Sequence, residues 1–309
     1  MKIKNLNFSD DALVFSPMAG VGDFSLRALA RSFGADFSYT EMVSCKGLIY
    51  ESAKTNDLLF TLPEEKSLGI QLFGGDEKDF ARVVKMPQLE KFDLIDINFG
   101  CPAPKIVRNA EGSALLEFPD KIFNIVKATV ENTSKPVTAK IRLGIDDDTI
   151  NAVEVAKAIE AAGASAITVH GRTQKQHYTG KVNYEGIALV KQSVSIPVIG
   201  NGDVVDQASY KKMLETKVDA VALARAAMGS PWVFGIIKGQ NPNYNLLDVM
   251  TRHYEGLKQI YPDEFLAKYL RKHFLWYLKP LGSRELNEKV VKMTDVKEML
   301  FEIENFLMK

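Results

Sequence analysis

Eight short apolar segments, spaced about 20 to 40 residues apart, constrain the fold of this chain of 309 residues more than any other feature. They occupy residues 12–15, 37–39, 68–73, 92–97, 137–141, 166–169, 197–199 and 220–223. Near-continuous apolar strands separated by longer amphipathic segments are typical of a parallel sheet that is covered on both faces. Eight such units predict a (β/α)8 TIM barrel, with a doubly wound open sheet as the structural alternative.

The segments between these strands, and the whole C-terminal part, carry helical patterns. Residues 150–162 have apolar positions at helical spacing and end before Gly163, and residues 206–214 read similarly. After Trp232 no strand-like segment follows, and helices are expected at 246–260, 262–278 and 290–308. The sequence Asn-Pro-Asn at 241–243 interrupts the chain. We therefore expect a barrel domain over residues 1–240 and a small all-helical C-terminal domain over 241–309.

Charge and cysteine content exclude several classes of protein. Lys and Arg total 39 and Asp and Glu total 39, so the net charge is zero, which argues against a uniformly basic surface but not against a local basic groove. Cys45 and Cys101 cannot cross-link a chain of this size, and no Cys, His or carboxylate cluster has metal-binding spacing. We predict no metal site. Without a signal sequence or a long apolar segment, we expect a cytoplasmic protein with no membrane span.

The sequence DINFGCP at residues 96–102 is the most suggestive local feature. An apolar strand ends in Asn98, turns at Gly100 and presents Cys101, and Pro102 cannot continue a strand ladder. Chemistry in barrel enzymes lies at the carboxyl ends of the strands. The other predicted strands end in polar or backbone-accessible groups as well, which are Pro17, Met18, Ala19, Gln71, Lys140, Arg142, His170, Arg172, Asn201, Gly202, Asp203, Ala224 and Arg225.

Two groups of these strand-end residues indicate a bound cofactor. Loops after the seventh and eighth strands of a barrel often bind phosphate, and Gly202 and Arg225 lie in those loops, although a tight turn with an exposed arginine is the alternative. Gln71 and Lys140 suit the polar rim of a flavin ring; a backbone cap and a rim ion pair are the alternatives. His170 reads equally well as a structural histidine or as part of the site.

The helical tail contains a basic and aromatic cluster. Arg271, Lys272 and His273 are close in sequence to Phe274, Trp276 and Tyr277. Such a cluster could contact a phosphate backbone and stack on bases. Composition alone favours the alternative, a solvated helix face beside an aromatic core stripe.

These motifs together resemble the tRNA-dihydrouridine synthase family, and its bacterial B type in particular. The resemblance extends over nearly the whole chain, and it rests on SPMAGVGD (16–23), TEMVSCKGL (40–48), IQLFG (70–74), DINFGCPAPKIVRNAEGSALL (96–116), AKIRLG (139–144), VHGRT (169–173), GNGDV (200–204) and ARAAMGSPWVF (224–234). It implies an FMN-binding barrel followed by a helical domain that helps to hold tRNA. It also implies the reduction of the C5=C6 bond of uridine in tRNA, with FMN reduced by NADPH or NADH.

The resemblance assigns roles to individual residues. Cys101 would be the general acid, and Asn98 and Arg172 would contact the flavin or the uridine, with Arg271 and Lys272 at the tRNA. The flavin would be bound by Pro17, Met18, Ala19, Gln71, Lys140, His170, Asn201, Gly202, Asp203, Ala224 and Arg225. Two departures from the family pattern are Ala226, where glycine is usual, and the loop 110–113, which has fewer glycines and adds Glu111.

Two other functions stay open from the sequence. One is an FMN barrel reductase of a free pyrimidine, similar to dihydroorotate dehydrogenases, which the helical tail and the Gly-Cys-Pro turn disfavour. The other is a non-catalytic RNA-binding module on an enzyme-like barrel, which Cys101, Gln71 and Lys140 disfavour. We expect a monomer, and the sequence gives neither the uridine position nor the preference between NADPH and NADH.

Overall fold

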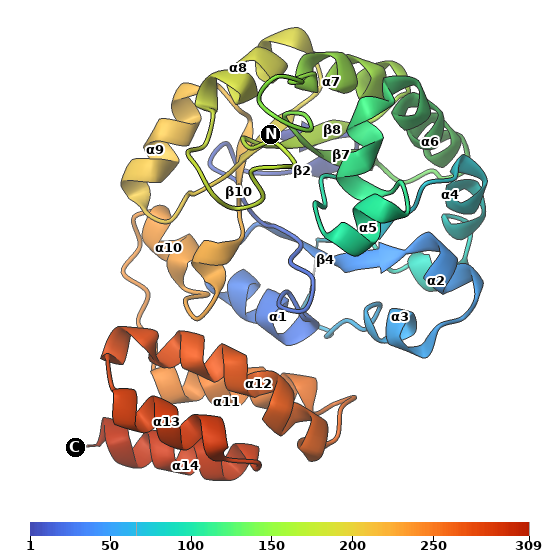
Figure 1. Ribbon diagram of the computed structural model, residues 1–309. Helices are drawn as coiled ribbons and strands as arrows, with labels where there is room; N and C mark the ends of the chain where they lie inside the picture. The colour runs from blue at the N-terminus through green and yellow to red at the C-terminus, as the bar shows by residue number, and fades with distance from the viewer. Residues whose placement is uncertain (66, 309) are drawn as a thin grey trace.

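The computed structural model describes residues 1–65 and 67–308, and its central feature is a closed barrel of eight parallel strands (Figure 1). The strand order β10-β3-β4-β5-β6-β7-β8-β9 confirms the predicted (β/α)8 barrel over the open sheet. The strands are β3 (Leu13–Phe15), β4 (Phe37–Ser44), β5 (Leu68–Phe73), β6 (Leu94–Phe99), β7 (Val137–Arg142), β8 (Ala166–His170), β9 (Val198–Asn201) and β10 (Ala220–Leu223).

One strand begins later than its apolar segment. The segment at 92–97 predicts a strand from Phe92, but β6 runs from Leu94 to Phe99. Phe92 still belongs to the preceding turn, because its N–H donates to the carbonyl of Leu89 at 3.2 Å. The carboxylate of Asp93 then accepts a hydrogen bond of 2.8 Å from the backbone N–H of Leu68 at the start of β5. The shift carries Asn98 into the strand itself.

Helices surround the barrel (Figure 1). The larger ones are α1 (Phe24–Ser32), α4 (Glu77–Val83), α6 (Pro119–Glu131), α7 (Ala152–Ala161), α8 (Tyr184–Ser193) and α9 (Gln207–Glu215). Shorter ones are α2 (Cys45–Ile49), α3 (Ala53–Asp57), α5 (Pro104–Arg108), α10 (Val233–Ile237) and the 3-10 turns η1 (Pro87–Leu89), η2 (Gly112–Glu117) and η3 (Arg225–Ala227). The helices predicted at 150–162 and 206–214 correspond to α7 and α9, and a capping box between Asp206 and Ser209 starts α9.

Small and aromatic side chains fill the amino-terminal half of the barrel. Phe37 and Tyr39 of β4 pack there with alanines and aliphatic residues of β3, β6, β9 and β10. A two-stranded hairpin, β1 (Lys2–Ile3) with β2 (Leu6–Asn7), precedes the barrel, and Met1, Leu6 and Phe8 pack against this cluster. The amino-terminal end of the barrel is therefore closed, which leaves the carboxyl end for a ligand.

The C-terminal part is a bundle of four helices. These are α11 (Leu246–Leu257), α12 (Asp263–Leu278), α13 (Arg284–Lys292) and α14 (Val296–Leu307), with η4 (Lys279–Leu281) between α12 and α13. The single helix expected at 290–308 is wrong: α13 begins earlier, the backbone is extended at Met293, and the carboxylate of Asp295 caps a new helix through Lys297 N–H and Glu298 N–H. The core of this bundle continues onto Phe24 and Leu29 of α1, beside which the bundle lies in Figure 1.

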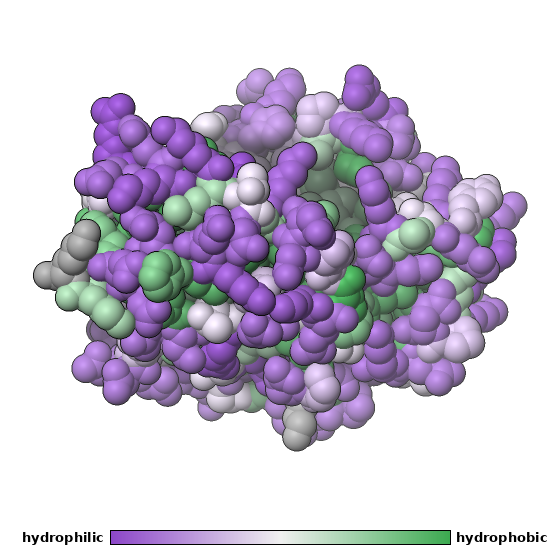
Figure 2. All heavy atoms as spheres, turned by 90° about the horizontal axis from the view of Figure 1, so that it is seen from below, coloured by the Kyte–Doolittle hydropathy of each residue, from purple (hydrophilic) through white to green (hydrophobic). Residues whose placement is uncertain are grey.

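Figure 2 shows that hydrophilic residues cover most of the face seen from below, with hydrophobic side chains in small separate patches. Within residues 1–65 and 67–308, no helix has the length and apolar character required to cross a membrane.

Candidate active site

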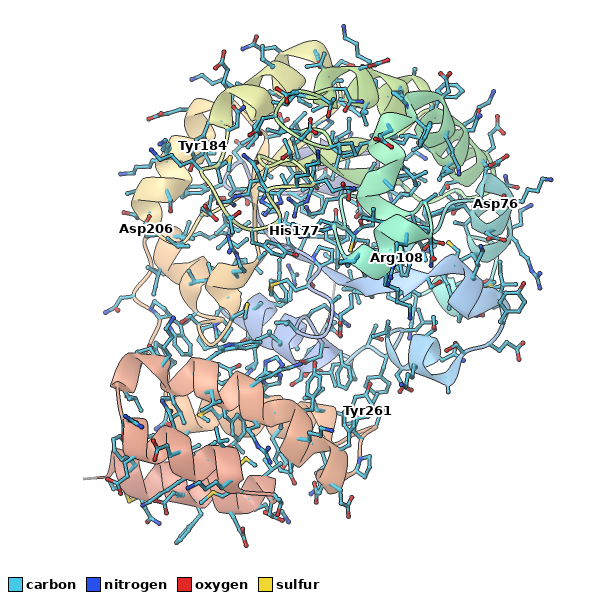
Figure 3. The ribbon with its side chains drawn as sticks, viewed as in Figure 1. Asp76, Arg108, His177, Tyr184, Asp206 and Tyr261 are labelled. Carbon is cyan, nitrogen blue, oxygen red and sulfur yellow. The ribbon has the colours of Figure 1, made fainter. Side chains whose placement is uncertain are left out.

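A cavity of about 730 Å³ opens at the carboxyl ends of the barrel strands. Residues from all eight strands or the loops that follow them contribute to its lining, and His177 lies over the middle of the barrel in Figure 3. This volume is within the range of small-molecule and cofactor sites. The position agrees with the general location of active sites in such barrels.

The strand register stacks polar residues in two layers inside the barrel. Gln71, Asp96 and Thr138 are neighbours across β5, β6 and β7. Two residues further along the strands, Lys140 of β7 lies between Asn98 of β6 and Thr168 of β8. Because side chains alternate along a strand, both layers face the same side of the sheet, and the second layer is nearer the cavity mouth.

A chain of hydrogen bonds connects Asp96 to the turn that carries Cys101. Gln71 Nε2 donates to Asp96 Oδ2 at 2.6 Å, and Asn98 Nδ2 donates to Gln71 Oε1 at 2.7 Å. Asn98 Oδ1 then accepts from the backbone N–H of Gly100 at 3.0 Å and of Cys101 at 2.8 Å. Since a carboxylate can only accept, Asp96 fixes which way both amides point. Burial raises the pKa of Asp96 to about 6.

Cys101 lies at the cavity edge on this fixed turn. Its carbonyl oxygen accepts from the hydroxyl of Ser113 at 2.8 Å and from the backbone N–H of Ser113 at 3.1 Å. A Cβ added to Gly112, whose φ is +60°, would lie 2.8 Å from that carbonyl oxygen, so the close approach requires glycine. Burial raises the pKa of the Cys101 thiol, although the charges of Arg142 and Lys140 oppose this. The thiol therefore stays protonated at neutral pH.

Two cations flank the thiol on β7. Lys140 lines the cavity, and burial, followed by the nearby charge of Arg142, lowers its pKa to about 8. In the described part of the chain Lys140 forms no ion pair. Arg142 is buried and donates to the carbonyl of Gly100 at 2.8 Å and to the carbonyls of Thr173 and His177 at 2.8 Å each. It thereby joins the Cys101 turn to the loop after β8.

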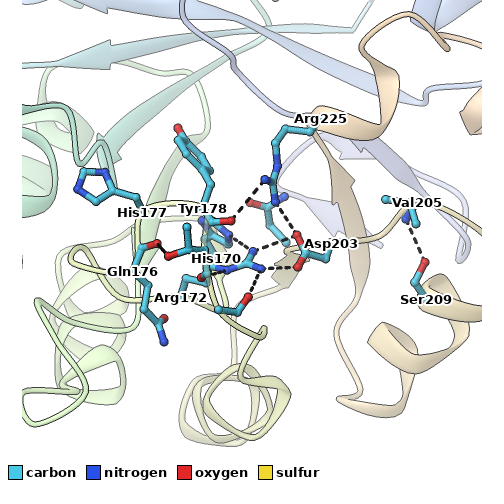
Figure 4. Close-up of polar contacts among 12 residues, drawn as sticks. His170, Arg172, Gln176, His177, Tyr178, Asp203, Val205, Ser209 and Arg225 are labelled. Carbon is cyan, nitrogen blue, oxygen red and sulfur yellow. Dashed lines mark hydrogen bonds and ion pairs between the residues drawn. The ribbon is translucent and has the colours of Figure 1, made fainter. Parts of the chain in front are cut away.

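The opposite end of the cavity contains a carboxylate between two arginines (Figure 4). Arg172 Nη1 donates to Asp203 Oδ1 at 3.0 Å, its Nη2 pairs with Asp203 Oδ2, and Arg225 Nη2 donates to Asp203 Oδ1 at 2.6 Å. Hydrogen bonding by Arg172 lowers the pKa of Asp203. Gly202 has a φ of +135°, and a Cβ there would lie 2.9 Å from Val182 Cγ2. Within the described residues the backbone N–H groups of Gly202 and Asp203 have no backbone acceptor outside the strand ladders.

His170 lies between these two ends. It is buried at the end of β8, with Nε2 3.5 Å from Arg172 Nη1. Burial, with the charges of Lys140, Arg142, Arg172 and Arg225, holds the pKa of His170 far below its usual range. The imidazole is therefore neutral, with Nε2 as the acceptor facing the arginine, and it is suited to hydrogen bonding rather than to proton donation.

The segment after β3 forms a third wall of the cavity. Ser16, Pro17, Met18 and Ala19 line it, and the hydroxyl of Ser16 is buried without a hydrogen-bond partner among the described residues. The next peptide is held from both sides, because Gly20 N–H donates to the carboxylate of Glu41 and Lys272 Nζ donates to the carbonyl of Gly20. Burial raises the pKa of Glu41 to about 7.

Most of the residues singled out in the sequence lie together in this cavity. Its lining includes Pro17, Met18, Ala19, Gln71, Asn98, Cys101, Lys140, His170, Asn201, Gly202, Asp203, Ala224 and Arg225. Arg172 lies behind Asp203, and Lys272 reaches Gly20 from the helical bundle. Arg271 donates to the carbonyl of Met293 at 2.7 Å within the bundle and is not among the cavity residues.

Sequence reasoning missed Asp96 and Tyr178, and it singled out Arg142 without giving it a role. Asp96 anchors the amide chain, Arg142 links two loops, and Tyr178 lines the cavity with its ring centroid 5.6 Å from Arg142 Cζ and 5.4 Å from Arg225 Cζ. Arg142 was noted at the strand end because it follows Lys140 at the two-residue spacing of one strand face. Tyr178 lies in a loop, where no periodic pattern points to it.

Of the two departures from the family pattern, one lines the cavity and the other lies in the loop that supports Cys101. Ala226 lines the cavity within η3. Ala110 has a φ of +55°, a left-handed conformation that glycine adopts without cost and alanine does not. The loop that supports Cys101 therefore contains local strain.

Comparison with known proteins finds one family over almost the whole chain. The family model described as Dihydrouridine synthase (Dus) matches residues 14–308. The chain is 33% identical to tRNA-dihydrouridine synthase B of Pasteurella multocida and 37% identical to that of Pseudomonas aeruginosa, in both cases over 95% of this chain and 92% of the relative. A probable tRNA-dihydrouridine synthase of Rickettsia conorii is 37% identical over 98% of this chain and 96% of its own.

Among solved structures, a mandelate oxidase variant is similar with a TM-score of 0.50 and 17% sequence identity, over 77% of this chain and 74% of that one. At this level the similarity concerns the fold alone, and it agrees with the barrel described above.

Proposed function

The chain belongs to the dihydrouridine synthase family, and on that basis we propose that it reduces the C5=C6 bond of uridine in tRNA, with Cys101 as the proton donor. We further propose that residues 1–240 bind FMN, that NADPH reduces it, and that residues 241–309 form a helical tRNA-binding domain. The observation that carries the proposal is the position of Cys101, which is held on a fixed turn at the edge of a cofactor-sized cavity where burial raises the pKa of its thiol.

The charges and hydrogen-bond donors of the cavity residues support FMN as the ligand. Lys140 is a partly buried cation that forms no ion pair within the described chain, and it suits the electron-rich N1–C2=O edge of a flavin. The N–H groups of Gly202 and Asp203, which have no acceptor outside the strand ladders among the described residues, suit a phosphate together with the guanidinium of Arg225. The Asp203 carboxylate would repel phosphate, so its contribution is the backbone N–H and the orientation of the arginines. Reduced flavin, when bound by these residues, would supply a hydride to C6 of uracil.

The protein residues then complete the reduction. Addition at C6 leaves an enolate-like anion across C5 and the C4 carbonyl, and this anion needs a proton at C5. A thiol with a raised pKa keeps its proton until such a base is formed. Asn98 sets the position of Cys101 through two backbone N–H groups, while Lys140 and Arg142 stabilise negative charge in the cavity.

The tRNA must present a single unstacked base to this cavity. A uridine in a folded RNA cannot contact residues at the bottom of a barrel mouth unless it is turned out of its stack. Lys272 donates to Gly20, next to the cavity residue Ala19, whereas Arg271 donates to Met293 within the bundle, so Lys272 is the one of the two cations that lies beside the cavity. We therefore expect Lys272 to contribute more than Arg271 to the affinity for RNA.

The decisive experiment is Cys101→Ala in protein loaded with FMN. We expect a yellow protein whose flavin is reduced by NADPH as in the wild type, but whose single-turnover reduction of unmodified tRNA is slower by at least 100-fold. Unchanged tRNA reduction would remove Cys101 from the role of acid. A matched control is Cys45→Ala, since Cys45 is buried away from the cavity lining.

The same assay separates the free-pyrimidine alternative. Free uridine and orotate should leave the reduced flavin unchanged, whereas unmodified tRNA should reoxidise it. Rapid reoxidation by orotate with no effect of tRNA would favour a dihydroorotate dehydrogenase-like activity. Protein that binds no FMN would favour a binding module without catalysis.

A further inference from the structure

A second group of chemically versatile side chains lies away from the cavity, between the barrel and the helical bundle. Asp23 precedes α1 of the barrel, while His253 belongs to α11 and His273 to α12. All three are buried, and none lines the cavity. One ligand atom from each lies within 4.8 Å of the others. The fold therefore brings together a carboxylate and two imidazoles that are up to 250 residues apart in the chain.

The distances in this group resemble those between ligands of one metal ion. His253 Nε2 lies 3.2 Å from both carboxylate oxygens of Asp23, and His273 Nε2 lies 3.7 Å from Asp23 Oδ2. The second distance is too long for a hydrogen bond. Ligands about 2.0–2.1 Å from a tetrahedral Zn²⁺ are about 3.3 Å apart, so only small movements would place an ion between these atoms.

The ring of His273 gives independent support. Only 1% of its side chain is exposed. Both ring nitrogens are buried and have no hydrogen-bond partner among the described residues. Buried polar atoms in native proteins almost always have a partner. A lone-pair interaction with an ion would satisfy Nε2, which already faces the Asp23 carboxylate.

The surrounding groups orient the other two ligands. Tyr277 Oη lies 3.1 Å from Nδ1 of His253, and Asp23 accepts hydrogen bonds from Leu26 N–H at 2.9 Å and from Tyr269 Oη at 3.1 Å. Metal-ligating imidazoles and carboxylates usually have such hydrogen bonds behind them, because these fix the tautomer and the direction of the lone pair.

We propose that Asp23, His253 and His273 bind one divalent transition metal ion, preferably Zn²⁺, which joins the barrel to the helical bundle. Two imidazoles and a carboxylate suit Zn²⁺, and a water molecule would supply the fourth ligand. The sequence predicts no metal site because these three residues are far apart along the chain. The fold brings them together. The proposal does not depend on the proposed reaction.

The test measures zinc in the full-length, flavin-loaded protein. The protein is treated with a chelator, incubated with a small excess of ZnCl₂ and desalted, and zinc is then counted by mass spectrometry. We expect about one zinc per chain. His273→Ala and Asp23→Asn should each weaken zinc binding by at least 100-fold. Asparagine is as good a helix N-cap as aspartate, so Asp23→Asn preserves the start of α1 while removing the charge.

The control is His177→Ala, which removes an exposed histidine at the cavity and should keep the full zinc content. X-ray absorption of the wild-type protein should show nitrogen and oxygen ligands at about 2.0–2.2 Å, with two imidazoles. Zinc should raise the Tm of the wild type and not that of His273→Ala. The proposal would be overturned if the wild-type protein retained no zinc, or if His273→Ala retained as much zinc as the wild type. The three residues would then form only a hydrogen-bonded cluster. The zinc content of the wild type tests the proposal even if a variant misfolds.

Discussion

At one end of the cavity the Asp203 carboxylate lies between Arg172 and Arg225, whereas at the other end Lys140 has no acidic partner in the described chain. The first end is neutralised largely by the protein itself, so it can be preorganised without a ligand. The second keeps a partly buried cation that forms no ion pair, and its desolvation is costly until an anion arrives. The difference suggests that the Asp203 end serves to hold a ligand and the Lys140 end serves to stabilise charge that forms during the reaction.

Lys140→Met should produce the largest effect. Loss of the cation removes stabilisation of the anionic site, and we expect the single-turnover rate of tRNA reduction to fall by about 10²–10³-fold. The Tm without cofactor should rise, because methionine fills the space without a buried charge. Stopped-flow flavin absorbance and thermal unfolding measure the two effects. The control is Lys175→Met, at an exposed lysine. An unchanged rate for Lys140→Met would show that the Lys140 end of the cavity does not stabilise charge in the reaction.

Asn98→Ala should have the next largest effect. It deletes the oxygen that accepts from Gly100 N–H and Cys101 N–H, so the turn carrying the thiol is no longer fixed. We expect the rate of protonation to fall by about 10- to 100-fold with little change in FMN affinity, which matches the loss of positioning. Asn56→Ala, at an exposed position in α3, is the control. A large loss of FMN with no change in rate would show that Asn98 acts on the cofactor instead.

The pH dependence of turnover should reflect Lys140. Its pKa is lowered to about 8, so the cation is present below pH 8 and is lost as the pH rises above it. The pKa of Cys101 is raised, so the thiol remains protonated through the same range. We expect kcat to be constant below about pH 8 and to fall up to tenfold per unit above it. In Lys140→Arg the decline should move to higher pH, since arginine stays protonated. An identical profile in that variant would assign the decline to another group.

Arg225→Gln should give the smallest change. Arg225 shares Asp203 with Arg172 and is half exposed, so its loss removes one of several phosphate contacts. We expect the Kd for FMN to rise by up to tenfold, with an unchanged rate once FMN saturates the protein. Fluorescence titration of the flavin measures the affinity. A rate defect that excess FMN does not correct would show that both ends of the cavity take part in the chemistry.

The sequence predicts the barrel and most of the cavity because both depend on local patterns. Apolar segments give the strands, and a polar residue such as Lys140 or Asn98 at a strand end is visible without any tertiary information. Asp96 looks like an ordinary residue in DINFGCP until the register of β5 and β6 puts it beside Gln71. Tyr178 and the group at Asp23 also depend on contacts between distant segments. The break between α13 and α14 was missed because one capping residue, Asp295, decides it.

The peptide at Gly20 is held by Glu41 from the barrel and by Lys272 from the bundle, next to the wall formed by Met18 and Ala19. A rotation of α12 against the barrel therefore acts on Gly20 through the Lys272 contact. The width of the cavity mouth is thus coupled mechanically to the angle between the two parts of the molecule. A macromolecule that engages the bundle has a direct means of changing how tightly the wall encloses whatever lies inside the barrel.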